Sequence, residues 1–244
     1  MRKLSFTIVL IILIYNVVAL TAFAQDNQKL AQTGMKFLSV SLDPRATGMG
    51  DATTAVFTKS SAMLYNPAVM AELEGYSDFS FGTTRWIADI NYIYGSAAFN
   101  LFDGQYGVFG VSLVAVDYGE FIGTVVAPNG DGFLEVGNFK PTSFALGIGY
   151  ANQLSEKFSV GGNVKYTRQS MGTAVTGYDA DGNGKVEENK VDAFAFDFGI
   201  LYHTGFKSLD FGMSIRNFAT EIKYKDEEFQ LPLLFKIGVS INAF

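Results

Sequence analysis

Alternating hydrophobicity is the feature that most constrains what this chain can fold into. From Ser77 onward, segments of about ten residues place large apolar side chains at every second position, with small or polar side chains between them. A β-strand turns successive side chains to opposite sides, so each segment would have one apolar and one polar face. The segment 156–170 shows both faces: Phe158, Val160, Val164 and Tyr166 alternate with Ser159, Gly161, Asn163, Lys165, Thr167 and Gln169.

Two kinds of sheet could use this pattern. In a transmembrane barrel the apolar face meets lipid and the polar face lines the interior, whereas in a soluble, exported β-sandwich the apolar face covers a core. Bulky residues stand on one face in segment after segment, which favours lipid contact over an interdigitated core. The sequence therefore predicts an all-β, antiparallel transmembrane β-barrel, in which four charged residues could pair inside or be solvated: Lys165, Asp197, Asp210 and Arg216.

The alternating segments also predict where strands and connections lie. Strands are expected at about 77–86, 90–101, 105–118, 142–153, 156–170, 191–203, 208–218 and 231–243. Short turns at 103–104, 154–155 and 205–207 contrast with long loops at 119–141, 170–190 and 219–230. Short turns on the periplasmic side and long loops outside are typical of outer-membrane barrels. The connection 87–89 is an exception, because it is short but would lie outside.

The first residues predict export. Arg2 and Lys3 precede an apolar run from 8 to 20, and the stretch 21–24 places small residues at the −3 and −1 positions before Gln25. This is the pattern of a secretory signal peptide over 1–24, since the apolar run is short for an uncleaved spanning helix. No later stretch contains 18 consecutive apolar residues, so the mature chain would cross a membrane as strands. The expected location is the bacterial outer membrane, with its lipid as one partner.

Composition excludes several classes of function. The net charge is −6 with no basic patch, which disfavours nucleic acid, and the absence of cysteine excludes disulfides. No G-x-S-x-G, P-loop or paired-cysteine pattern occurs. His203 is the single histidine and has no clear Ser or Asp partner in the sequence. We therefore predict that the chain is not an enzyme and binds no cofactor.

Residues 25–76 differ from the barrel segment 77–244 and predict a compact, partly helical N-terminal plug. Gly48-Met49-Gly50 reads as a permissive turn. Asn66-Pro67 reads as the cap and first residue of a helix that continues from Ala68 to Leu73 and stops at Gly75. This chemistry accounts for Asn66, Pro67 and Ala68 as structural residues, although the segment could also shape a ligand pocket.

Two stretches of this unit resemble a known family. Phe37-Leu38 followed by 45–52 (RATGMGDA) is similar to the FL…R-A-x-G-M-G-x-A opening of the PorV/PorQ family. Residues 65–68 (YNPA) resemble an element shared with FadL-like long-chain fatty acid transporters. With the signal peptide and the strand pattern, the resemblance covers nearly all of the mature chain, and the two motifs together are more specific than N-P-A alone.

The resemblance implies a FadL-like outer-membrane barrel of about 14 strands with an N-terminal plug. About eight strands are visible here, and the terminal Phe244 is out of phase with Phe235, Ile237, Val239 and Ile241, so we expect further strands in the natural protein. PorV-like proteins belong to the type IX secretion system of Bacteroidota-type bacteria, where they receive folded cargo. The resemblance therefore implies that the external loops bind secreted cargo or type IX secretion components.

An alternative is a FadL-like channel for long-chain fatty acids or other hydrophobic small molecules. It needs an apolar pocket between plug and wall. The candidate lining residues, which could equally form the plug's own core, are Met49, Met63, Leu64, Val69 and Met70.

The segment 179–190 resembles an EF-hand calcium loop. Asp179, Asp181, Asn183 and Glu187 occupy positions 1, 3, 5 and 9, with glycine at position 6. Position 12 is Lys190 where a bidentate Glu is expected, which removes two ligand oxygens and adds a positive charge. The sequence therefore predicts at most weak calcium binding, and a polar hairpin tip is the alternative.

Six aromatic residues are predicted near strand ends, where they could form a girdle at the membrane interface or simply reflect strand propensity. They are Trp86, Tyr92, Tyr94, Tyr118, Tyr166 and Tyr202.

Overall fold

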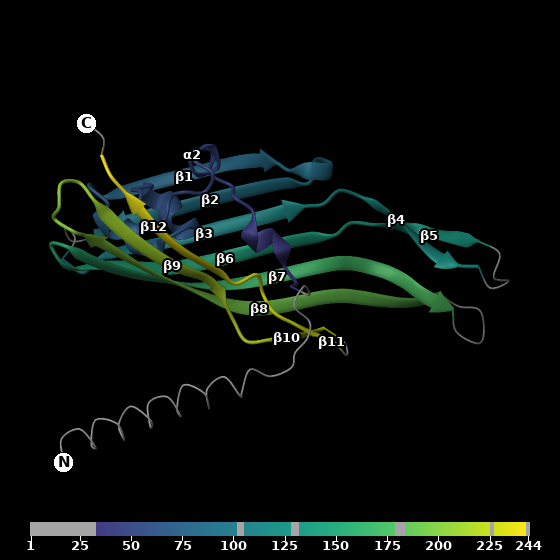
Figure 1. The fold of residues 1–244 in the computed structure, drawn as a ribbon. Coiled ribbons are helices and arrows are strands. Elements are labelled where there is room, and N and C mark those ends of the chain that lie inside the picture. The colour runs from purple at the N-terminus through teal and green to yellow at the C-terminus, as the bar shows by residue number, and fades with distance from the viewer. Residues whose placement is uncertain (1–32, 102–104, 128–131, 179–183, 225–226, 243–244) are drawn as a thin grey trace, which may run out of the picture. The chain divides into compact units, whose positions relative to one another are not determined.

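The structure is a computed structural model that describes residues 33–101, 105–127, 132–178, 184–224 and 227–242. These residues belong to one compact unit that begins at Thr33. It consists mainly of one antiparallel sheet with short helices on its inner side (Figure 1). Among the described residues, no helix has the length and apolar character needed to cross a membrane.

The main sheet contains eight strands, and all its neighbouring pairs are antiparallel. In spatial order they are β1 (Ser77–Arg85), β2 (Asn91–Asn100), β3 (Val108–Asp117), β6 (Thr142–Ser155), β7 (Phe158–Tyr178), β8 (Gly184–His203), β9 (Asp210–Phe218) and β12 (Leu234–Ser240). Each predicted strand is present, so the prediction of an antiparallel barrel wall is confirmed. Within the described residues β1 and β12 remain the two edges of the sheet, so the wall is not closed.

The connections predicted as long loops contain regular hairpins. β4 (Phe121–Val126) pairs with β5 (Phe133–Phe139), and β10 (Ile222–Tyr224) pairs with β11 (Glu227–Phe229). β7 and β8 continue as a long hairpin to the pair Tyr178–Gly184. Aromatic and β-branched residues favour strands here even without one continuous apolar face.

The short connections lie mostly where the sequence places them. β6 extends to Ser155, so the turn is at 156–157 rather than 154–155, and the turn 205–207 lies between β8 and β9. The connection 87–89 forms a single 3-10 turn, η4 (Ile87–Asp89). The predicted turn 103–104 lies outside the described residues.

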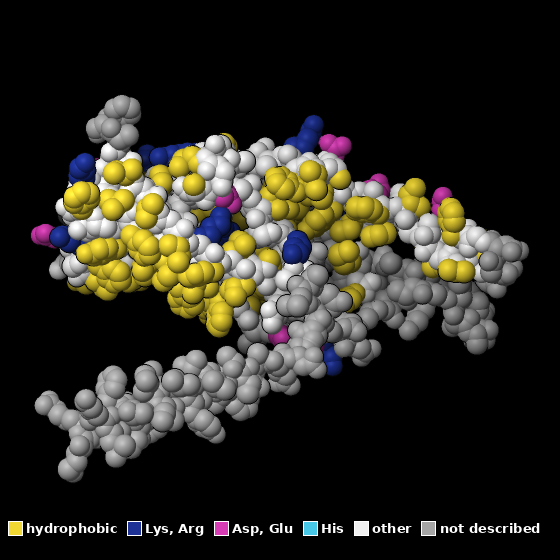
Figure 2. Space-filling model, in the orientation of Figure 1, with side chains coloured by type: hydrophobic (Ala, Val, Ile, Leu, Met, Phe, Trp, Pro, Cys, Tyr) yellow, Lys and Arg dark blue, Asp and Glu magenta, His cyan; other side chains and the backbone are white. Residues whose placement is uncertain are grey.

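The apolar face of the sheet points outward and is uncovered. Ile148 is 65% exposed and Phe81 is 86% exposed, while Phe158 and Phe211 are half-buried. Figure 2 shows broad patches of hydrophobic side chains on the surface. Beyond the main sheet, the described residues contain the two-stranded hairpins β4–β5 and β10–β11, and these form no second layer over this face. The structure therefore contradicts the soluble β-sandwich alternative.

The N-terminal segment packs on the inner face of the wall. It contains η1 (Lys36–Ser39), α2 (Pro44–Gly48), η2 (Lys59–Leu64) and η3 (Pro67–Glu72). The helix predicted over 68–73 is the short 3-10 helix η3, which ends at Glu72, before Gly75 adopts a φ of +83°. Buried side chains of this segment and of the inner wall form two apolar clusters.

Candidate functional site: the plugged interior

Asn66 joins the N-terminal segment to the wall. It is fully buried, and its Oδ1 caps η3 by accepting a hydrogen bond from the Ala68 N–H at 3.2 Å. Its Nδ2 donates to the carbonyl of Thr54 at 2.6 Å and to that of Ile200 in β8 at 3.1 Å. Pro67 takes the first helical position, where a missing N–H costs nothing. The predicted cap is thus confirmed in form, and it also docks the segment.

Glycines on the inner face of β7, β8 and β9 make this docking possible. Gly161 and Gly199 are register partners. A Cβ on Gly161 would lie 2.5 Å from the Ala68 nitrogen, and one on Gly199 would lie 1.8 Å from Asn66 Oδ1. Gly212 leaves the same room for the segment before η2. The backbone of the N-terminal segment thus approaches the wall so closely at these positions that only glycine leaves enough room.

A second glycine pair receives Met63. Gly110 of β3 and Gly149 of β6 are register partners, and a Cβ on either would lie 2.5 Å from the Met63 sulfur. The unbranched thioether fills the depression that the two glycines leave. The N-terminal segment consequently contacts β3 and β6 as well as β7, β8 and β9.

The Gly48-Met49-Gly50 stretch lies at the exposed end of α2. Gly50 has a φ of +60°, a conformation that favours glycine. A Cβ added to Gly48 would meet no atom within 4 Å. Met49 is 39% exposed. The turn leads into Asp51, whose Oδ2 accepts from Lys236 Nζ of β12 at 3.0 Å. This motif therefore shapes a turn that fixes an ion pair to the last described strand.

A polar network is buried between β7, β8 and β9. Lys165 Nζ lies 2.9 Å from Asp197 Oδ1 and donates to Asn217 Oδ1 at 2.6 Å. Asp197 also accepts from Asn163 Nδ2 at 3.0 Å and from the backbone N–H of Asn217 at 2.8 Å. The Asp197 carboxylate is 1% exposed, and each of its two oxygens accepts from at least one of these donors. Lys165 and Asp197 thus pair inside the wall, as one of the two sequence alternatives expected, whereas Arg216 has no carboxylate partner among the described residues.

Arg216 and Tyr65 hold the start of the N-terminal segment. Arg216 Nη2 donates to the Leu38 carbonyl at 3.4 Å, and its guanidinium lies 5.6 Å from the centre of the Tyr65 ring. The Tyr65 hydroxyl accepts from the backbone N–H of Leu42 at 3.2 Å and from that of Asp43 at 3.0 Å.

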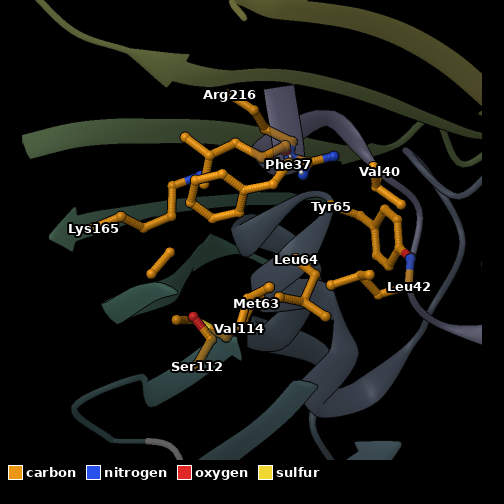
Figure 3. Close-up of a pocket in the computed structure, with 12 residues that line it drawn as sticks. Phe37, Val40, Leu42, Met63, Leu64, Tyr65, Ser112, Val114, Lys165 and Arg216 are labelled. Carbon is orange, nitrogen blue, oxygen red and sulfur yellow. Dashed lines mark hydrogen bonds between the residues drawn. The ribbon is translucent and has the colours of Figure 1, made fainter. Parts of the chain in front are cut away.

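A small cavity of about 30 Å³ lies between these groups (Figure 3). Met63 and Leu64 line it, whereas Val69 and Met70 pack into a separate apolar cluster. A pocket for a drug-sized molecule usually has about 300–1,000 Å³. The predicted apolar channel pocket is therefore not formed by these side chains in this conformation.

His203 has partners that the sequence did not reveal. Its Nε2 lies 2.5 Å from Glu72 Oε1 of η3, and its Nδ1 lies 2.7 Å from Asp210 Oδ1 of β9. Burial raises the pKa of the Glu72 carboxyl, although His203 opposes that shift. Asp210 stands opposite His203 in the strand register, so the predicted hairpin β8–β9 could have signalled that contact.

The calcium prediction cannot be placed on the structure. Asp179, Asp181 and Asn183 lie outside the described residues, and Glu187 is described by its backbone in β8, opposite Ala174. Among the described residues, no group of three or more His, Cys, Asp or Glu side chains is arranged so that it could hold a metal ion. Weak calcium binding in the loop stays a prediction, for which calorimetry on the folded protein is the test.

The aromatic girdle is only partly formed. Tyr92 and Tyr94 are 3% and 4% exposed and point inward, so the girdle prediction was wrong for them. Tyr118 also faces inward, because its hydroxyl shares a hydrogen bond with Ser143. Two others are each 40% exposed: Trp86 and Tyr202.

Comparison with known proteins identifies the family. The family model described as type IX secretion system protein PorV matches residues 23–243. No match was found among curated proteins. Among solved structures, the toluene transporter TbuX of Ralstonia pickettii is 13% identical, with a TM-score of 0.47 over 82% of this chain and 63% of that transporter. This chain thus spans less than two thirds of the transporter's length. On the family match, the chain belongs to the PorV family of outer-membrane proteins.

Proposed function

We propose that this protein acts, without catalysis, in type IX secretion by binding secreted cargo or partner proteins through its long hairpins. The observation that carries the proposal is the apolar surface of the β4–β5 hairpin. Ile122, Val126 and Phe133 are 61%, 77% and 68% exposed there. Exposed apolar side chains that gather on one element are typical of protein interaction sites.

The neighbouring hairpins would give this surface a firm base. Phe121 and Phe139 stack across β4–β5, at 5.7 Å between ring centres. Arg168 and Asp192 pair across β7–β8 through two hydrogen bonds, and the Tyr224 hydroxyl of β10 donates to Asn189 of β8. A surface that is ordered before binding loses less entropy when a partner docks.

Charge substitution on the hairpin tests the proposal. Val126→Asp and Phe133→Asp should reduce chemical cross-linking to cargo or secretion partners in intact cells, because each places a charge in the apolar contact. Thr173→Asp is the matched control, since it adds the same charge at an exposed polar position of the β7–β8 hairpin, outside the apolar surface of β4–β5. Heat-modifiable migration on gels would show that each variant barrel is folded. Unchanged cross-linking in both apolar variants would contradict the proposal.

The FadL-like channel is the second candidate, on the resemblance of residues 65–68 to an element of FadL-like transporters; the apolar groove of about 310 Å³ beside Phe79, Gly95 and Leu113 lies on the outer face and not between plug and wall. Mass spectrometry of purified protein would detect a co-purified hydrophobic molecule. Its presence in place of protein partners would favour the channel.

We also propose that residues 1–24 are a signal peptide removed on export, that 25–76 form the plug and that 77–244 form the barrel. The support is the sequence pattern at 21–25 and the docking of the described part of the plug on the wall. Mass spectrometry of the mature protein should find Gln25 at its N-terminus. A retained N-terminus in the outer membrane would contradict the cleavage.

A further inference from the structure

A positive charge without a partner is buried beside the interior cavity. Lys165 and Arg216 both line this cavity and are 8% and 7% exposed. Lys165 is neutralised by Asp197, whose two oxygens are already used by Lys165, Asn163 and the backbone of Asn217. The two cations are thus accompanied by one carboxylate.

Arg216 is the residue left uncompensated. Among the described residues, no carboxylate oxygen lies within 4.0 Å of its guanidinium, and its contacts are the neutral Leu38 carbonyl and Tyr65 ring. Its Nε is buried and has no hydrogen-bond acceptor in the described part of the chain. A guanidinium cannot lose its proton in a protein, so it cannot relieve this charge as a buried lysine could. Burying an unpaired charge is costly, so a compensating group is favoured.

We infer that the cavity binds one small monovalent anion of the size of chloride. The Arg216 Nε–H would donate to it, the Lys165 ammonium would add attraction, and Ser112 offers a hydroxyl at the cavity wall. Figure 3 shows Lys165 and Arg216 beside Phe37 at one side of the cavity. A cavity of about 30 Å³ has room for a water-sized occupant, and chloride is only slightly larger than water. The same volume excludes the chain of a fatty acid.

The anion would stabilise the docked plug. Arg216 comes from β9, Lys165 from β7 and Phe37 from η1, so an ion beside Arg216 would lie between the wall and the N-terminal segment. Water could fill the same space but would leave the charge of Arg216 uncompensated. Because this inference depends on charge balance and not on the hairpins, it stands or falls separately from the proposed function.

Thermal unfolding of the full chain in detergent tests the inference. Chloride or bromide should raise the midpoint in a saturable way relative to gluconate at equal ionic strength, because gluconate does not fit the cavity. Arg216→Met should lose this response. Lys236→Met should keep it, because Lys236 is paired one-to-one with Asp51 and does not line the cavity.

Anomalous scattering from crystals grown in bromide provides an independent measurement that does not need the Arg216 variant to fold. A peak within hydrogen-bond distance of Arg216 Nε and close to Lys165 is the expected result. Equal midpoints in chloride and gluconate, or a cavity that holds water alone in bromide crystals, would overturn the inference.

Discussion

Gly199→Ala tests whether the wall is shaped to the N-terminal segment. The added methyl would lie 1.8 Å from Asn66 Oδ1 and 3.2 Å from the Ala68 nitrogen, so Asn66 must move. Overpacking of this kind costs about 1–3 kcal/mol. Displacing Asn66 also weakens its bonds to Thr54 and Ile200, at about 1 kcal/mol for each bond. We therefore expect the free energy of unfolding to fall by about 3–5 kcal/mol in total.

Gly162→Ala is the matched control. Gly162 follows Gly161, the register partner of Gly199, but it faces outward. A Cβ added to Gly162 would meet the Asp197 carbonyl oxygen at 3.6 Å, which is an ordinary contact distance. Alanine in place of glycine should be neutral there or stabilise the strand by about 0.5–1 kcal/mol. Urea unfolding in lipid vesicles would measure both, and limited proteolysis would report release of the segment before β1. Equal stability and equal protection in the two variants would refute the argument.

Three further substitutions probe other parts of the structure. Tyr65→Phe removes the acceptor of the Leu42 and Asp43 N–H groups and should cost about 1–3 kcal/mol for each N–H left unpaired, measured by the same unfolding assay; an unchanged midpoint would show that water replaces the hydroxyl. Ile148→Lys places a charge on the outward face and should cost about 2–4 kcal/mol in a bilayer; no cost there would argue against lipid contact. Because the pKa of Glu72 is raised above 4.5, its contribution to stability is full below that pH and is lost as the pH rises through the raised value. Stability should therefore fall less with rising pH in Glu72→Gln, and a steeper fall would contradict this reasoning.

The sequence was sufficient for the wall and its two faces. Period-2 alternation depends on the geometry of a single strand, so the outward positions of Ile148 and Phe235 could be read without knowing any partner. The Asn66-Pro67 cap is equally local, and it was predicted for the same reason. The regular hairpins beyond Tyr118 were missed, because their residues do not form one continuous apolar face.

The interior could not be predicted in the same way. Asn66 bonds to Ile200, and Glu72 meets His203, so each contact depends on which strand lies next to the N-terminal segment. The alternating pattern places a small residue at position 199, but it does not show that Asn66 Oδ1 occupies the space beside it. Tyr92 and Tyr94 point inward because the segment offers them an apolar surface, which a count of aromatics at strand ends cannot show.

The docking of the N-terminal segment has a consequence for the order of assembly. Its anchors on the wall are separated from it by long stretches of chain: 134 residues between Asn66 and Ile200, and 185 between Asp51 and Lys236. The N-terminal segment is synthesised first, and it can therefore make these contacts only after β8 and β12 have been synthesised. Bringing such distant segments together is entropically costly and slow. During biogenesis the N-terminal segment would remain undocked until the wall has formed, and factors that shield unfinished chains would have to protect it throughout that interval.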